Sequence, residues 1–129
     1  MPLSEKRPLV AVVDDDPAIC KAIGRLITKS KFDVMTFTCG QKLLDMLQVR
    51  RPNCLLLDLH MPGLSGLDIL RAMANAGMKL PVIIITGSDE PTSHAQCLAA
   101  GALAVLLKPL DPAEILRAID QALRQREPE

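Results

Sequence analysis

The chain contains the run Cys54-Leu55-Leu56-Leu57-Asp58, four apolar residues that end in a carboxylate. Three further apolar runs end in the same abrupt way: Leu9 to Val13 before Asp14, Asp15 and Asp16, Val82 to Ile85 before Thr86, and Ala104 to Leu107 before Lys108. Short continuous apolar runs are typical of parallel strands that are covered on both faces. Open α/β sheets bind ligands where the carboxyl ends of their strands meet, so we expect these polar groups to share one pocket.

Segments with helical character separate the strands. Asp16 before Pro17 is a typical helix start, since aspartate caps free amides and proline suits the first helical position. Ser65 followed by Asp68 has the pattern of a capping box. We expect strands at residues 9–13, 33–37, 54–58, 82–86 and 104–107, and helices at 16–30, 40–48, 65–77, 91–100 and 111–123. Five such βα units predict an α/β domain with a doubly wound parallel sheet in three layers.

The composition is that of one globular domain, because 129 residues with 49% hydrophobic content are enough to bury a core. Fifteen basic residues balance fifteen acidic ones, which argues against nucleic acid as a partner of this segment. No apolar run approaches the roughly 20 residues that span a bilayer, and residues 1–7 lack the apolar core of a signal peptide. We therefore expect a cytoplasmic protein that makes no membrane contact.

The cysteines lie far apart in the sequence and have no zinc-type spacing, namely Cys20, Cys39, Cys54 and Cys97. This pattern favours packing in the core of a protein in a reducing compartment over disulfides or a metal site.

The polar residues at the strand ends have the chemistry of phosphoryl transfer. Clustered carboxylates such as Asp14, Asp15 and Asp58 repel one another unless a cation neutralises them. Oxygen ligands suit Mg²⁺, which binds through one or two carboxylates and a substrate phosphate. Phosphoryl transfer needs positioning and charge neutralisation more than covalent help, so Asp58 as nucleophile, Mg²⁺ and Lys108 form a sufficient set.

Three further groups complete this candidate site. Thr86 supplies a hydroxyl donor, and the backbone amides of Leu59 and Gly87 are candidates to hold phosphoryl oxygens, with Gly87 leaving room for their approach. Each strand-end residue taken alone also fits an ordinary role in a turn, a cap or a solvated surface. Their combination is what indicates a site.

Several blocks of the sequence together resemble the receiver domain of two-component response regulators. The resemblance covers about residues 9–123 in the right order, and its motifs are Val13-Asp14-Asp15, residues 57–66 around Asp58, Ile85-Thr86-Gly87 and Leu107-Lys108-Pro109. It implies a flavodoxin-like fold with strand order 2-1-3-4-5. It also implies Mg²⁺-dependent phosphorylation of Asp58 by a histidine kinase or a histidine phosphotransfer protein.

The resemblance assigns roles to individual residues. Asp15, Asp58 and the backbone carbonyl of His60 would ligate Mg²⁺, or Mn²⁺ as its substitute, with Asp14 acting largely through water. Lys108 would pair with the phosphoryl group and Thr86 would swing toward it. The peptide before Pro109 would be cis.

A few positions depart from the family's usual pattern. Val105 stands where an aromatic residue commonly rotates with the threonine, Leu110 where phenylalanine is common, and Ser65 where an aspartate often precedes the glycine. His60 and Ser88, each two residues after a site residue, occupy places that tune phosphoryl lifetime in relatives. We hypothesise that His60 sets that lifetime in this chain.

Three functions stay open. The first is a signalling module that catalyses only its own phosphorylation and dephosphorylation and switches an interaction surface for an effector protein or output domain. A homodimer through the fourth helix, fifth strand and fifth helix is a further expectation. The second is a degenerate receiver that binds a partner constitutively, suggested by Val105 and Leu110. The third is an aspartyl-phosphate phosphatase similar to the haloacid dehalogenase family, suggested by the D-x-D spacing of Asp14 and Asp16 but disfavoured by the chain length and Pro17.

The domain expectation is a receiver at residues 9–123 between two short segments. Residues 1–8 are expected to form an N-terminal tail. Residues 124–129 are expected to form a C-terminal tail or the start of a linker to an output domain.

Overall fold

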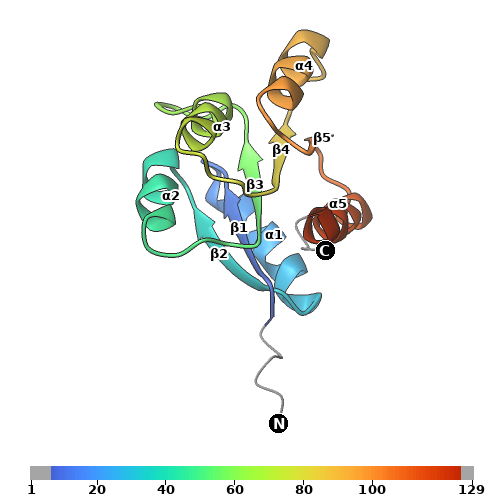
Figure 1. Ribbon diagram of the computed structural model, residues 1–129. Coiled ribbons are helices and arrows are strands. Elements are labelled where there is room, and N and C mark those ends of the chain that lie inside the picture. Colours follow the sequence, from blue (N-terminus) through green and yellow to red (C-terminus); the bar gives the residue numbers. More distant parts are fainter. Residues whose placement is uncertain (1–6, 126–129) are drawn as a thin grey trace.

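The computed structural model describes residues 7–125, in which strands and helices alternate (Figure 1). The strands are β1 (Leu9–Val13), β2 (Asp33–Phe37), β3 (Cys54–Asp58), β4 (Val82–Thr86) and β5 (Ala104–Leu107). The helices are α1 (Pro17–Lys29), α2 (Gly40–Leu47), α3 (Gly66–Asn75), α4 (Pro91–Ala99) and α5 (Pro112–Gln125). Every predicted strand has the expected bounds, and the helices differ from prediction by one or two residues at their ends.

The strands form one parallel sheet in the order β2-β1-β3-β4-β5, which confirms the predicted flavodoxin-like α/β fold. β3 lies at the centre of the sheet, with Leu57 opposite Val13 of β1 and Asp58 opposite Ile85 of β4. The chain therefore places the end of β3 between the ends of β1 and β4.

Alternate residues of the inner strands face two separate cores, one on each side of the sheet. Leu55, Leu57 and Ile84 pack with α2, α3 and α4, whereas Leu56 and Ile83 pack with α1 and α5. Figure 1 shows these two helical layers on opposite sides of the strands. This double coverage explains why β1, β3 and β4 are apolar at every position before the site.

The segments predicted as tails lie partly outside the described residues, which exclude 1–6 and 126–129. Pro8 accepts a hydrogen bond from the amide of Asp33 (2.9 Å), and Arg7 donates to the carbonyl of Thr28 (3.0 Å). At the other end, α5 continues through Arg124 to Gln125. Residues 7–8 and 124–125 thus contact or continue the elements of the predicted range 9–123. Within residues 7–125, no helix is both long and apolar enough to cross a membrane.

Helix α4 is the most weakly anchored helix of the domain. Cys97 is its one buried residue, whereas α1, α2, α3 and α5 each bury three or four. The start of α4 is instead fixed by polar contacts, because the Glu90 carboxylate accepts hydrogen bonds from the amide (2.9 Å) and the hydroxyl (2.7 Å) of Ser93.

Candidate functional site

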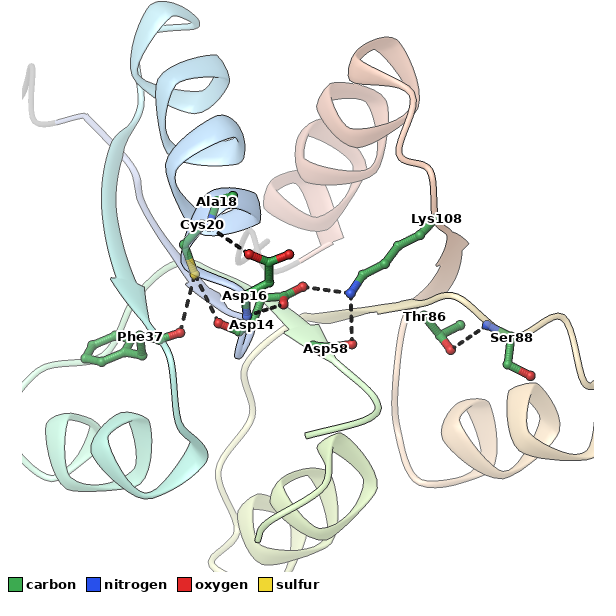
Figure 2. Close-up of polar contacts among 9 residues, drawn as sticks. All are labelled: Asp14, Asp16, Ala18, Cys20, Phe37, Asp58, Thr86, Ser88 and Lys108. Atoms are coloured by element: carbon green, nitrogen blue, oxygen red, sulfur yellow. Dashed lines mark hydrogen bonds and ion pairs between the residues drawn. The ribbon is translucent and has the colours of Figure 1, made fainter. Parts of the chain in front are cut away.

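Four polar side chains meet at the carboxyl edge of the sheet, each just at or after the end of a different strand. Asp58 ends β3, Thr86 ends β4, Asp14 follows β1 and Lys108 follows β5. Figure 2 shows the Lys108 side chain reaching across this edge to Asp14 and Asp58. Asp14, Asp58 and Thr86 are almost completely buried, with exposed fractions of 0%, 2% and 0%. The parallel topology thus brings together residues that are up to 94 positions apart.

Lys108 is the cation of the cluster. Its Nζ lies 2.9 Å from Oδ2 of Asp14 and 3.4 Å from Oδ1 of Asp58. Oδ1 of Asp14 accepts a hydrogen bond from the amide of Asp16 at 2.9 Å, whereas no hydrogen bond of ordinary geometry reaches its buried Oδ2 within the described residues. A buried carboxylate oxygen without such a bond needs a cation nearby, and Lys108 supplies one.

Burial sets the electrostatics of the acceptor candidate. Burial, followed by the charge of Asp14, raises the pKa of Asp58 from 3.8 to about 6, and Lys108 and the backbone amide of His60 oppose this rise. For Lys108, burial lowers the pKa, but close contact with Asp14 and the charge of Asp58 outweigh it, so the net pKa is raised. Two carboxylates therefore share one cation at this edge, and a second cation would relieve their repulsion.

Asp14, Asp15 and Asp58 have the arrangement that a second cation needs. Each offers one carboxylate oxygen, and these oxygens lie within 4.8 Å of one another. Asp15 is exposed, so the cluster opens to solvent on its side. Mg²⁺ prefers hard oxygen ligands and keeps several bound waters. The cluster offers carboxylate oxygens, one of them on Asp14 without a hydrogen bond, and it opens to solvent. The residues present therefore fit this ion.

The hydroxyl of Thr86 is turned away from the acids. Its Oγ1 accepts a hydrogen bond from the amide of Ser88 at 3.1 Å, and Figure 2 shows this contact on the side away from Asp58. Gly87, between them, is exposed, and a Cβ at this position would have no heavy atom within 4 Å. The β4–α4 loop thus leaves open space for a group beside Thr86, as predicted for Gly87.

One predicted contact is wrong. The amide of Leu59 donates to the carbonyl of Ile85 at 2.9 Å, where it extends the β3–β4 pairing. Its proton is therefore not available to a phosphoryl oxygen. The amide that interacts with the Asp58 carboxylate belongs instead to His60. The sequence could not separate neighbouring amides, because a strand uses alternate groups for pairing and the register decides which ones remain free.

Other predicted features have clear positions. The Lys108–Pro109 peptide is cis, and Ser65 and Asp68 form the predicted capping box at the start of α3. Val105 lies opposite Ile84 and packs in the α4-side core. His60 is exposed beside the site.

Three further residues contact the backbone of the site, and the sequence did not predict these contacts. Gly66 allows α3 to start directly on β3, because a Cβ there would lie 2.6 Å from the carbonyl oxygen of Asp58. Cys20 donates its thiol to the carbonyl of Asp14 at 3.3 Å. His94 contacts the carbonyl of Ser88 at 2.7 Å. Gly66 lies in a quoted motif, but nothing in the sequence indicates which carbonyl a cysteine or histidine will meet.

Comparison with known proteins gives one consistent family. The family model described as "Response regulator receiver domain" matches residues 10–120. The curated response regulator protein TmoT of Ectopseudomonas mendocina is 30% identical over 95% of this chain and 56% of its own length. Response regulator MprA of Mycobacterium avium is 34% identical over 93% of this chain and 53% of its own length. The chain thus spans about half the length of these curated relatives.

Solved structures agree with this result. A response regulator receiver protein from Burkholderia phymatum is 38% identical, with a TM-score of 0.81 over 92% of this chain and 96% of that one. The receiver domain of the Francisella response regulator 1452 has a TM-score of 0.89 over 94% of this chain and 100% of that one. Its identity is 23%, so this second likeness concerns the fold alone.

Proposed function

The chain belongs to the response regulator receiver domain family of two-component systems, and from that premise we propose that it is a Mg²⁺-dependent phosphoacceptor that is modified on Asp58. The observation that carries this proposal is the position of Asp58 between a buried acid, Asp14, and the ammonium of Lys108. A carboxylate in that position can act as a nucleophile while fixed charges stabilise the transferred group.

In the proposed reaction, a carboxylate oxygen of Asp58 attacks the phosphorus of a phosphohistidine on a kinase or phosphotransfer protein. The new P–O bond forms as the P–N bond breaks, and the imidazole leaves with its electron pair and takes up a proton. Lys108, the His60 amide and the Gly87 amide hold the phosphoryl oxygens, and Thr86 turns to donate its hydroxyl. Asp15, Asp58 and the His60 carbonyl would hold Mg²⁺, with Asp14 through water, and the ion would neutralise charge on the acids and the phosphoryl group.

Dephosphorylation is the second reaction of this site, and the protein acts as an enzyme only on itself. A water molecule attacks the phosphorus, and inorganic phosphate leaves as the Asp58 carboxylate is restored. His60, whose side chain is exposed, and Ser88 each stand two residues after a site residue in the chain, which supports a role beside the attacking water. We propose that His60 sets the phosphoryl lifetime. An unchanged dephosphorylation rate in His60→Asn and His60→Ala would remove this idea.

A groove beside Lys108 supports a helical partner as the phosphoryl donor. It lies between α1 and the loop after β5, is lined mainly by Ile19, Ile23, Leu26, Pro109 and Leu110, and has a volume of about 350 Å³. An apolar groove of this kind accepts the apolar face of a helix. A donor helix seated there would bring its histidine close to Asp58.

The other side of the domain supports an output surface. Leu98 of α4 and Leu107 of β5 are large apolar residues that are exposed by 50% and 41%. We propose that phosphorylation changes this surface, which then binds an effector protein or output domain or a second copy of the chain. Light scattering with and without a phosphoryl mimic tests phosphorylation-dependent dimerisation, and one unchanged mass in both states would exclude it.

The test of the proposed function is intact mass after incubation with acetyl phosphate and Mg²⁺. We expect one added phosphoryl group, lost in the presence of a chelator and in Asp58→Asn. Mass is the suitable readout because the chain has no Trp or Tyr for fluorescence. If Mg²⁺ binds but no mass is added, the result would favour a constitutive binding module, and Val105 and Leu110 become the residues to explain.

A further inference from the structure

The loop between β4 and α4 is tied to both elements by hydrogen bonds through Ser88. Its amide donates to Oγ1 of Thr86 at 3.1 Å, and its hydroxyl accepts from the amide of Glu90 at 3.3 Å. Its carbonyl lies 2.7 Å from Nε2 of His94, which is in the second turn of α4. Ser88 thus touches the buried threonine of the site with one backbone group and helix α4 with the other.

The contact between His94 and Ser88 has a defined direction. A carbonyl oxygen can only accept, so Nε2 of His94 carries the hydrogen and donates it. At 2.7 Å this is the shortest contact between an α4 side chain and the loop backbone in the described part of the chain. His94 is half-buried, which shields this bond partly from competing water.

The hydrogen bond between His94 and Ser88 contributes much to the position of α4, because this helix makes few other contacts with the rest of the domain. The helix buries Cys97 alone, so apolar packing contributes little to fixing its position. The remaining ties are polar and lie at its start, where Glu90 holds Ser93 and His94 holds Ser88. A small displacement of the Ser88 carbonyl therefore affects one of the few contacts that fix the position of α4.

Movement of Thr86 must displace Ser88. The hydroxyl of Thr86 is turned to the Ser88 amide and away from Asp58 (Figure 2). If Thr86 turns its hydroxyl to a phosphoryl group on Asp58, the amide of Ser88 loses its acceptor, and the peptide units around Ser88 must find a new arrangement. The Ser88 carbonyl belongs to this small loop and moves with it.

The aromatic ring that commonly moves with the threonine in this family is absent here, because Val105 stands at that position and packs on the α4 side of the sheet. We propose that His94 is the positioning residue that couples Thr86 to α4, acting through the carbonyl of Ser88. The coupling rests on the proposed phosphorylation of Asp58. It gives a receiver without an aromatic switch a route from the site to the α4 surface that carries Leu98.

The first experiment needs no mutation and uses the ring nitrogens of His94 as the probe. The ¹⁵N shifts of the imidazole are recorded with Mg²⁺ alone and with Mg²⁺ and beryllofluoride, which mimics the phosphoryl group. Loss or lengthening of the bond to Ser88 should move the Nε2 resonance. An Nε2 resonance that stays in place while the amides of His60 and Gly87 shift would overturn the proposal.

The second experiment compares three variants in the same state by amide chemical shifts. In His94→Ala, the response of residues 93–100 to beryllofluoride should fall by about twofold or more, because α4 then loses its side-chain contact with the Ser88 carbonyl. His94→Gln, whose amide can donate from nearly the same position, should restore much of it. Ser93→Ala is the matched control, since it weakens the start of α4 through Glu90 without touching Ser88.

Intact mass separates the possible failures. If the wild type and all three variants gain one phosphoryl group while His94→Ala keeps the full α4 response, phosphorylation stands and the coupling through His94 is wrong. If the wild type gains no phosphoryl group, the proposed function and the coupling that rests on it both fall. An α4 response lost equally in Ser93→Ala and His94→Ala would also contradict the proposal, because general loosening of α4 would then explain both.

Discussion

Nζ of Lys108 lies 2.9 Å from Oδ2 of Asp14, closer than the 3.4 Å that separates it from Oδ1 of Asp58. The charge balance of this edge is therefore not a simple pair between the lysine and the acceptor candidate. Lys108 first compensates a buried acid that has few other partners. A cation that binds the carboxylates would release the lysine for a phosphoryl group.

Lys108→Met tests this view by removing the charge and keeping the length of the side chain. It leaves two buried acids without a cation, and we expect the free energy of unfolding in chelator to fall by about 2–3 kcal/mol, below the range for fully buried pairs because Lys108 retains some exposure. Mg²⁺ should stabilise this variant more than the wild type. Urea unfolding followed by circular dichroism measures both effects.

Arg124→Met provides the control for Lys108→Met. Arg124 pairs with Asp120 at 3.0 Å on the exposed face of α5 and should contribute about 0.5 kcal/mol or less. Equal losses in the two variants would mean that burial adds nothing to the Lys108 pair.

Asp58→Asn should stabilise the protein in a pH-dependent way. Burial and the charge of Asp14 raise the pKa of Asp58 from 3.8 to about 6, so the folded state binds its proton more tightly than the unfolded state. Ionisation of Asp58 therefore costs stability as the pH rises through this window. In chelator, the advantage of the asparagine variant should be absent below pH 3.8, develop between there and pH 6, and reach about 1–2 kcal/mol at neutral pH.

Unfolding midpoints of Asp58→Asn and the wild type across this pH range give the profile. Mg²⁺ at neutral pH should remove much of the difference, since the wild-type carboxylate then gains a partner that asparagine cannot replace. A constant difference from acidic to neutral pH would show that the pKa of Asp58 does not cause it.

The sequence predicted the fold because each strand carries its own signal. β1, β3 and β4 are apolar throughout and end in a polar residue, and this pattern alone indicates a sheet covered on both sides with one polar edge. The acids, Thr86 and Lys108 were found for the same reason. The contacts of Leu59, Cys20 and His94 could not be found this way, since each depends on which backbone group lies opposite in three dimensions.

Gly66 should tolerate no side chain, because α3 begins directly on the backbone of the acceptor candidate, Asp58. A Cβ at this position would lie 2.6 Å from the carbonyl oxygen of Asp58 and 2.9 Å from Cα of Leu59, which are both backbone atoms and cannot turn aside. We expect Gly66→Ala to lower the free energy of unfolding by about 1–3 kcal/mol and to slow phosphorylation, because α3 or the end of β3 must shift.

Gly24→Ala is a matched control for Gly66→Ala in the interior of α1. A Cβ there would meet Cγ2 of Thr36 at 3.8 Å, an ordinary contact, so the higher helix propensity of alanine should raise stability by about 0.5–1 kcal/mol. Urea unfolding of the two variants should give changes of opposite sign. A stabilising Gly66→Ala would mean that α3 does not rest on Asp58.

The four cysteines should differ sharply in reactivity. Cys20, Cys54 and Cys97 are buried, and burial raises the pKa of each thiol, to about 12 for Cys54. Cys39, just before α2, is half-buried and is the most accessible of the four. At neutral pH, iodoacetamide should therefore modify Cys39 at least about tenfold faster than the other three. Peptide mass mapping over time measures the rates, and unfolded protein should label at all four positions.

Cys20 makes this labelling experiment informative about the site. Its thiol donates to the carbonyl of Asp14 at 3.3 Å, and α1 must move away from the end of β1 before a reagent can reach it. Mg²⁺ bound at the acids next to Asp14 should oppose that opening, so the labelling of Cys20 should slow further when Mg²⁺ is added while that of Cys39 stays the same. Fast labelling of Cys20 with or without Mg²⁺ would show that the start of α1 opens readily and that the thiol does not hold Asp14 in place.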